Sequence, residues 1–251
     1  MKAQRLLPFL ALALLVLTVG VKTFAQQVVT FPSGGETASG FLYLPQGAGP
    51  HPAVIVIQEY WGVNDWIKQE AAGFAASGYV ALAVDLYRGK VADSPDMAHE
   101  MMRGLPQDQG IRDLTAGYAF LAERKDVKRD RIGAVGWCMG GGYAAQLAIA
   151  EPSLRAVAIN YGALPTDKAA LAKINAAVLG NFGGQDRGIS PDSVQAFEAN
   201  MKSLGKPVDA KIYPDAGHAF ENPNNKTGFR SEDAKDALSR IDRFLAANLQ
   251  H

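Results

Sequence analysis

The amino-acid sequence predicts a single-domain α/β fold with a mostly parallel central sheet and helices on both faces. Short runs rich in Val and Ile alternate along the chain with segments whose apolar residues recur at helical spacing. No linker, repeat or low-complexity stretch divides residues 26–251. Strands and helices that alternate in this way form a largely parallel sheet that helices cover on both sides.

Each expected element has its own signal in the sequence. A Gly-rich turn between the apolar segments 27–31 and 40–44 predicts a hairpin. Residues 53–57 are β-branched or small throughout, typical of a central strand buried on both faces. A helix follows, capped by Asn64 or Asp65 and closed by Gly78. The remaining expected strands are 79–84, 131–135, 155–161, 176–182 and 208–213, and the remaining helices are a short one opened by 94–96 and longer ones at 107–124, 140–150, 191–204 and 231–249.

The charge balance excludes one class of partner. The chain has 251 residues, with 25 basic and 25 acidic side chains and a formal net charge of +0. There is no basic field to attract nucleic acid and no charged tail. We expect a monomer that acts on a small molecule.

The N-terminus has the pattern of a secretory signal peptide. Lys2 and Arg5 precede an apolar stretch over 6–21, and Thr23-Phe24-Ala25 offers a small-x-small cleavage site. An uncleaved membrane anchor is the alternative, because the stretch is close to the lower limit for a spanning helix. Cleavage after Ala25 would remove three basic residues and no acidic one, leaving a net charge of −3. We therefore expect an exported, periplasmic or secreted protein with no stable membrane association after cleavage.

The only cysteine lies in a pattern typical of an enzyme nucleophile. Gly136-Trp137-Cys138-Met139-Gly140 follows an apolar strand and precedes a helix of small residues. A strand, a sharp turn and a helix form the nucleophile elbow, here with Cys in place of Ser. The positive end of the helix stabilises a thiolate at this position. The alternative is an inert, buried thiol.

A base and an orienting acid for Cys138 are expected further along the chain. His218 follows the last predicted strand, and Asp186 follows the strand before it. Ligands and catalytic groups gather at the carboxyl ends of parallel strands, and the order nucleophile, acid, His is that of an elbow enzyme. The alternatives are a surface loop for His218 and an Asx turn or helix cap for Asp186.

The loop after residues 53–57 carries a further candidate. Glu59 lies at the end of an apolar strand, where a carboxylate is costly unless it is paired or functional. In elbow enzymes this loop supplies one oxyanion-hole N–H and the residue after the nucleophile supplies the other. These donors are here the backbones of Tyr60 and Met139. Trp61 fits a core position and a pocket wall equally well.

These motifs together resemble the dienelactone hydrolase (carboxymethylenebutenolidase) family. The resemblance rests on 58–64, 85–87, 136–141 and 217–220, in this order, and covers about 38–248. It implies an α/β-hydrolase fold, a Cys138–His218–Asp186 triad and Glu59 as an auxiliary acid, with no cofactor and no metal. In the family the resting thiol is neutral and hydrogen-bonded to this glutamate. The thiolate then attacks an enol-lactone carbonyl, and the acyl-enzyme is hydrolysed.

The resemblance also implies a substrate-binding region, with two departures. Two arginines typically bind the substrate carboxylate in the family. Arg88, after Asp85-Leu86-Tyr87, matches one of them with a displacement of one position, and Asn222 stands where the other is expected. We therefore expect Arg88, Tyr87 and Trp61 to contact substrate. The alternatives are a broader carboxylesterase or thioesterase with the same triad, and, more distantly, a thiol redox sensor or a non-enzymatic binding module.

Overall fold

The structure, a computed structural model, describes residues 26–250. In this range eight strands form one sheet in the order β1-β2-β4-β3-β5-β6-β7-β8. The first two strands form an antiparallel hairpin, β2 pairs antiparallel with β4, and all other pairs are parallel. The strands are β1 Gln26–Ser33, β2 Glu36–Tyr43, β3 His51–Ile57, β4 Val80–Asp85, β5 Val127–Trp137, β6 Ala156–Asn160, β7 Ala177–Gly183 and β8 Val208–Tyr213.

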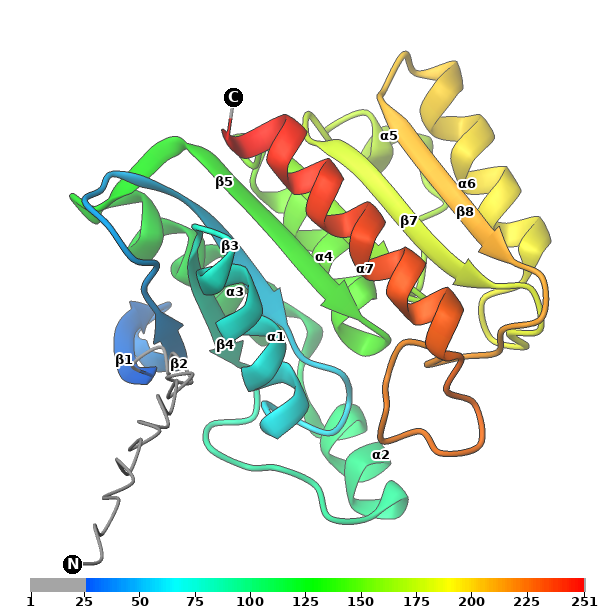
Figure 1. Cartoon of the computed structure of the whole chain (residues 1–251), viewed down its shortest axis with the longest axis horizontal. Coiled ribbons are helices and arrows are strands. Elements are labelled where there is room, and N and C mark those ends of the chain that lie inside the picture. Colours follow the sequence, from blue (N-terminus) through cyan, green and yellow to red (C-terminus); the bar gives the residue numbers. More distant parts are fainter. Residues whose placement is uncertain (1–25, 251) are drawn as a thin grey trace, which may run out of the picture.

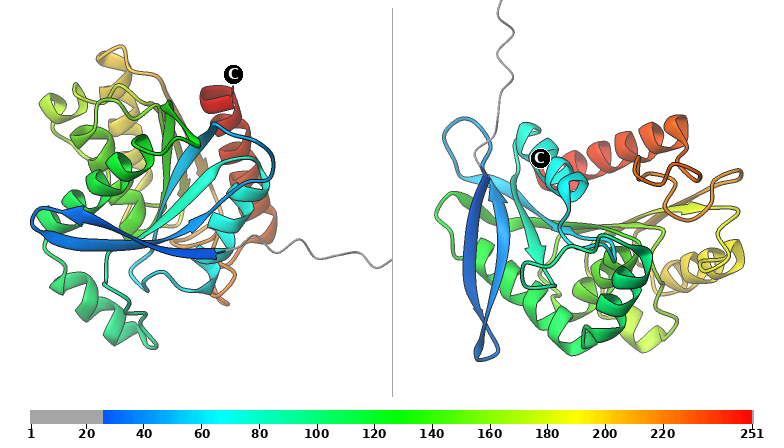
Figure 2. Two further views of the ribbon diagram at one scale, coloured as in Figure 1. Left: turned by 90° about the vertical axis from the view of Figure 1, so that its left-hand side faces the viewer. Right: turned by 90° about the horizontal axis from the view of Figure 1, so that it is seen from below.

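Helices cover both faces of the sheet, as Figures 1 and 2 show. One apolar cluster contains side chains of α1 and α7 against one face, and the other contains side chains of α3, α4 and α6 against the opposite face. Strands β3 and β4 are buried almost throughout because both faces are covered. The helices are α1 Asp65–Ala76, α2 Pro95–Gly104, α3 Gln107–Ala122, α4 Met139–Ala150, α5 Lys168–Leu171, α6 Pro191–Ser203 and α7 Ser231–Leu245, followed by the π-helix η1 Ala246–Gln250.

The parallel arrangement determines where a site can form. Strands β3, β5, β7 and β8 run in the same direction, so their carboxyl ends meet at one edge of the sheet. In Figure 1 the arrowheads of these strands point toward the end where α2 and the long loop before α7 lie. Segments far apart in the sequence are therefore brought together at that edge.

The predicted fold class is confirmed, and the bounds of several elements differ from the prediction by up to four residues, as at the starts of β2 and β5. Strand β5 begins at Val127, four residues before the predicted start, because its charged residues 128–130 lie on an exposed strand end where solvent hydrates them. The four-residue helix α5, capped by Asp167, was not predicted. The final turn, expected as α-helix, is a π-helix.

The predicted signal peptide, residues 1–25, lies outside the described residues. Among residues 26–250 no helix has the length and apolar character needed to cross a membrane.

Candidate active site

Cys138 lies at a sharp turn between β5 and α4. Its backbone has φ 55° and ψ −118°, and the helix begins at the next residue. The turn is possible because the neighbouring chain positions are glycines: a Cβ on Gly136 would lie 2.0 Å from the Gly140 carbonyl oxygen. A Cβ on Gly140 would lie 2.4 Å from the Gln58 carbonyl oxygen. The elbow therefore brings the thiol close to the end of β3 and exposes it at the edge of the sheet.

The predicted base and acid lie in a chain of contacts with this thiol. His218 Nε2 lies 3.1 Å from Cys138 Sγ, and His218 Nδ1 lies 2.6 Å from Asp186 Oδ2. Asp186 is buried, and its other oxygen accepts hydrogen bonds from the N–H groups of Gly188 and Ile189. Asp186 thus forms the Asx-type turn considered as its alternative role and contacts the histidine as well.

The charges of the three groups support one another. Burial by itself disfavours the charged imidazole, but the contacts with Asp186 and Cys138 raise the pKa of His218 to about 10. Burial likewise opposes ionisation of Asp186, yet its hydrogen bonds, above all that with His218, leave its pKa below the usual value. The arrangement can hold an imidazolium between the Asp186 carboxylate and the Cys138 sulfur at neutral pH.

Glu59 lies beside this triad and is almost fully buried. One carboxylate oxygen accepts a hydrogen bond of 3.2 Å from the Tyr161 hydroxyl, and the other accepts one of 2.6 Å from Asn222 Nδ2. Burial raises the pKa of Glu59 to about 7, although both hydrogen bonds act in the opposite direction. Within residues 26–250 the thiol contacts His218 rather than Glu59, so the thiol–glutamate hydrogen bond that the family resemblance implies is not formed in this structure.

The two predicted oxyanion-hole residues flank the thiol. Met139 is the first residue of α4, where a helix leaves its N–H groups without an intrahelical acceptor. Tyr60 follows the end of β3 and contributes to the cavity that contains Cys138 and His218. The Tyr87 hydroxyl lies 3.2 Å from Met139 Sδ, so Tyr87 contacts one of the two predicted oxyanion-hole residues.

Cys138 lies between two cavities. The first, of about 600 Å³, is lined by Glu59, His218 and Trp61 and by the loop residues 222 and 224–227. Trp61 is therefore a pocket wall. The second, of about 410 Å³, is lined by the first half of α4 and by residues 163–165, while Met102 borders both.

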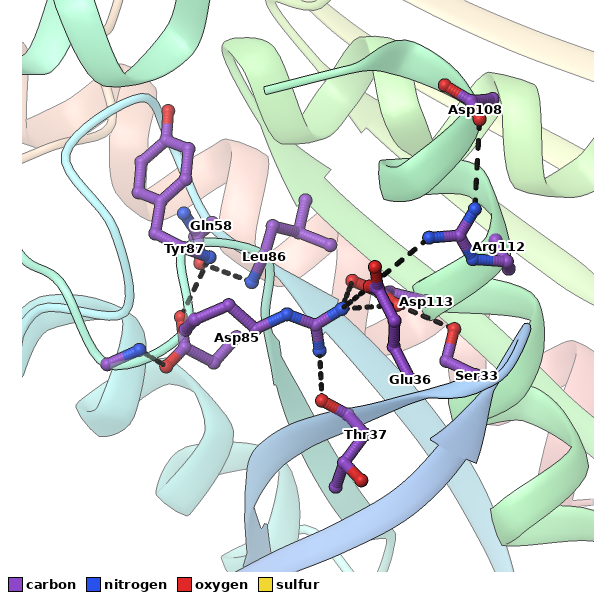
Figure 3. Close-up of polar contacts among 12 residues, drawn as sticks. Ser33, Glu36, Thr37, Gln58, Asp85, Leu86, Tyr87, Asp108, Arg112 and Asp113 are labelled. Atoms are coloured by element: carbon purple, nitrogen blue, oxygen red, sulfur yellow. Dashed lines mark hydrogen bonds and ion pairs between the residues drawn. The ribbon is translucent and has the colours of Figure 1, made fainter. Parts of the chain in front are cut away.

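Arg88 is not brought to these cavities. Its backbone is left-handed, with φ 56°, and its guanidinium donates to the Thr37 carbonyl oxygen at 2.7 Å. The same group forms ion pairs with Asp113 at 2.9 Å and with Glu36 at 3.3 Å. Figure 3 shows Glu36, Thr37 and Asp113 gathered beside the loop that carries Asp85 and Tyr87. Substrate binding by Arg88 stays a prediction, and its guanidinium is engaged elsewhere in this structure.

Two contacts of the site were missed by sequence reasoning. Tyr161 follows β6, is fully buried and has φ 37°; its place at the carboxyl end of a buried strand was a usable signal. In the sequence Asn222 was notable only because the family resemblance places an arginine at that position. Its contact with Glu59 joins residues 163 positions apart in the chain. No cluster of His, Cys, Asp or Glu that could hold a metal ion is found in the described part of the chain.

Comparisons with known proteins identify the family of this chain. The profile of the "Dienelactone hydrolase family" matches residues 38–249. A protein of Methylorubrum extorquens named "Putative carboxymethylenebutenolidase" is 31% identical over 231 residues, covering 86% of this chain and 79% of the relative. A protein of the same name from Escherichia coli K12 is 31% identical over 227 residues, covering 84% of this chain and 83% of the relative. The crystal structure of a "Putative Dienelactone Hydrolase" from Klebsiella pneumoniae superposes with a TM-score of 0.81 at 28% identity, covering 90% of this chain and 99% of that one.

Proposed function

Since the chain belongs to the dienelactone hydrolase family and is a hydrolase acting on esters or lactones, we propose that it cleaves them through an acyl-cysteine on Cys138. The observation that carries the proposal is the continuous line of contacts from the thiol through His218 to Asp186, at 3.1 and 2.6 Å. A nucleophile, a base within hydrogen-bond reach and a buried acid that orients the base are the parts this chemistry requires.

The acylation step uses the charge separation of the triad. The Cys138 thiolate attacks the carbonyl carbon, and the carbonyl oxygen becomes an oxyanion stabilised by the N–H groups of Tyr60 and Met139. The intermediate collapses when the bond from the carbonyl carbon to the leaving oxygen breaks, and His218 gives its Nε2 proton to that oxygen. The products are the alcohol, or the opened hydroxyl end of a lactone, and a thioester on Cys138.

The deacylation step reverses the proton transfer. Neutral His218 accepts a proton from water as the water oxygen attacks the thioester carbonyl, and collapse of the second intermediate releases the acid and restores the thiolate. Glu59 is proposed as the group that exchanges a proton with the thiol between turnovers, because a carboxyl with a pKa of about 7 is readily protonated and deprotonated near neutrality.

The site favours a broader ester substrate as a second candidate. The Asn222 amide donates a hydrogen bond to Glu59. The position where the family's second arginine is expected therefore carries no cation. An amide does not replace a bidentate guanidinium in binding a carboxylate. A neutral ester or thioester therefore suits the cleft as well as a lactone carboxylate does.

The experiment that tests the mechanism is acyl capture on the single cysteine. We expect intact-protein mass spectrometry after rapid acid quench to detect an acyl adduct on Cys138 with an activated ester, and we expect Cys138→Ala to lose both the adduct and turnover. His218→Ala is expected to slow hydrolysis by about 10³-fold or more, whereas the matched variant His51→Ala, at the opposite end of β3, keeps it. Wild-type turnover by Cys138→Ala would overturn the proposal.

Export is a separate proposal, supported by the basic residues, apolar stretch and small-x-small site in residues 1–25. We expect a mature chain that begins at Gln26 in the periplasmic or secreted fraction, measured by intact mass. An exported fraction that keeps the leader would contradict cleavage.

A further inference from the structure

We propose that the cleft is divided at Cys138 into an acyl arm and an alcohol arm, and that the preferred substrates are open-chain esters with an uncharged, apolar acyl chain. The inference rests on the proposed function, because it assigns the two sides of the ester bond to the two cavities that share Cys138. The acyl arm is the cavity of about 410 Å³, and the alcohol arm is the cavity of about 600 Å³.

The position of His218 decides which arm receives the leaving group. The leaving oxygen must lie within hydrogen-bond reach of His218 Nε2, because that nitrogen supplies its proton. His218 lines the cavity of about 600 Å³ and is not among the described residues lining the other. The alcohol portion of the ester therefore extends into the cavity on the His218 side. Since the carbonyl carbon must be at Cys138 Sγ, the acyl chain extends the other way.

The acyl arm is apolar. Its walls include Met102, Met139, Tyr143, Leu164 and Pro165, and besides Cys138 the polar groups of its described lining are the Tyr143 hydroxyl and the neutral amides of Gln107 and Gln146. Apart from Cys138 itself, no charged side chain of the described chain lines it. A carboxylate in this arm would lose hydration without gaining a cation, whereas each buried methylene of an acyl chain is favourable.

The walls of this arm are held in place before substrate binds. Met139, Tyr143 and Leu164 are partly buried side chains packed against the larger apolar core. The Tyr143 ring also packs on α3 at Gly110, where a Cβ would lie 2.5 Å from the ring. A preformed apolar surface requires little ordering when the acyl chain binds.

The alcohol arm differs in chemistry. Its lining includes Asn224, Lys226 and Thr227 on the loop before α7 as well as the Glu59 carboxyl, and Lys226 is the one lysine or arginine among its described lining residues. Polar alcohol groups fit this arm. A small lactone, in which the acyl and alcohol parts form one ring, fills neither arm.

The test is an acyl-length series with a constant leaving group, using p-nitrophenyl acetate, butyrate and hexanoate. A fully buried methylene contributes about 0.8 kcal/mol, equivalent to about fourfold in rate. Because the arm is open on one side, we expect kcat/KM to rise about two- to fourfold per methylene across the series. Leu164→Trp, which fills the arm, is expected to abolish the rise while acetate is still hydrolysed.

A variant that gains an activity tests the proposal without relying on a loss that misfolding could also cause. Leu164→Lys is expected to raise kcat/KM for the p-nitrophenyl monoester of glutaric acid at least tenfold relative to the hexanoate ester, because it places a cation in the acyl arm. Lys226→Ala, in the alcohol arm, is expected to leave the dependence on acyl length unchanged.

The outcomes separate the two proposals. A flat or falling length profile in an enzyme that still requires Cys138, or a Leu164→Trp enzyme with the wild-type profile, would overturn the two-arm assignment alone. Hydrolysis of the series that does not depend on Cys138 would overturn the proposed function and this inference with it.

Discussion

Asn222 Nδ2 donates a hydrogen bond of 2.6 Å to Glu59 Oε2, joining the loop after His218 to the end of β3. The family resemblance places an arginine at this position. The asparagine instead contacts Glu59, the proposed auxiliary acid: its amide acts to lower the pKa of a carboxyl whose pKa burial raises to about 7. Asn222 Oδ1 in turn accepts the Asn224 N–H, which fixes the orientation of the amide.

Replacing this amide by a carboxylate tests the role of Glu59. In Asn222→Asp a carboxyl group with nearly the shape of the amide faces the Glu59 carboxyl. Repulsion between the like charges at this distance raises the pKa of the pair. If Glu59 must be ionised to take the thiol proton, the acidic limb of the pH profile of kcat/KM moves upward from about pH 7. We expect activity at pH 7 to fall about tenfold.

The matched control is Asn224→Asp, which makes the same change of charge two residues away on an exposed part of the loop. We expect a much smaller movement of the acidic limb. Equal profiles for the two variants would remove the Asn222–Glu59 contact from the mechanism.

Glu59 also makes stability depend on pH. Its pKa is about 7 in the folded protein against an ordinary value of 4.5. Because the folded value is raised, the protonated carboxyl favours the folded state below about pH 4.5, and this contribution is lost as pH rises through 7. The corresponding free energy is about 3 kcal/mol.

Glu59→Gln removes this titration. We expect its free energy of unfolding, relative to wild type, to increase by about 3 kcal/mol between pH 4.5 and pH 8. Urea denaturation of both proteins at the two pH values measures this difference. Any hydrogen bonds that Glu59→Gln weakens cost the same free energy at both pH values, so they cancel when the two values are compared. A difference that does not change with pH would show that Glu59 titrates normally.

The sequence was sufficient to predict which strand ends carry Cys138, Asp186, His218 and Glu59, because topology brings the ends of parallel strands to one edge. Contacts that depend on loop conformation could not be predicted. Arg88 turns toward Asp113 and Glu36 because its backbone is left-handed, and these partners come from α3 and the first residue of β2. The position of Arg88 in the sequence alone led to the prediction that it contacts substrate.

Asp186→Asn is expected to uncouple the triad. The variant removes the negative charge that, together with the contact to Cys138, holds the pKa of His218 at about 10. The imidazolium then loses its proton at a lower pH, and the thiolate loses its partner. We expect kcat/KM to fall by about 10³- to 10⁴-fold.

The single cysteine gives this prediction a second measurement. Alkylation by iodoacetamide reports the thiolate fraction at Cys138 alone, and we expect its rate at pH 6 to fall at least tenfold in Asp186→Asn. Asp215→Asn, an exposed carboxyl on the neighbouring loop, is the control. An unchanged alkylation rate in Asp186→Asn would mean that the thiolate does not depend on the His218–Asp186 pair.

Gly140→Ala tests the close approach that builds the elbow. The added Cβ would lie 2.4 Å from the backbone oxygens of both Ile57 and Gln58, so α4 or the end of β3 must move. Overpacking of this kind costs about 1–3 kcal/mol. These two segments carry Cys138 and the Tyr60 backbone, so a displacement of about 1 Å is expected to lower kcat by about 10²-fold.

Gly73→Ala is the matched substitution in a helix, because nothing lies within 4 Å of the added Cβ in α1. It is expected to stabilise the fold by up to about 1 kcal/mol and to leave kcat unchanged. Thermal unfolding and ester hydrolysis of both variants measure the two effects. The diagnostic result is a loss of kcat in Gly140→Ala in protein that is still folded at the assay temperature, because it separates the geometry of the elbow from overall stability. Wild-type kcat in Gly140→Ala would show that the thiol and the oxyanion donors tolerate movement of α4 relative to β3.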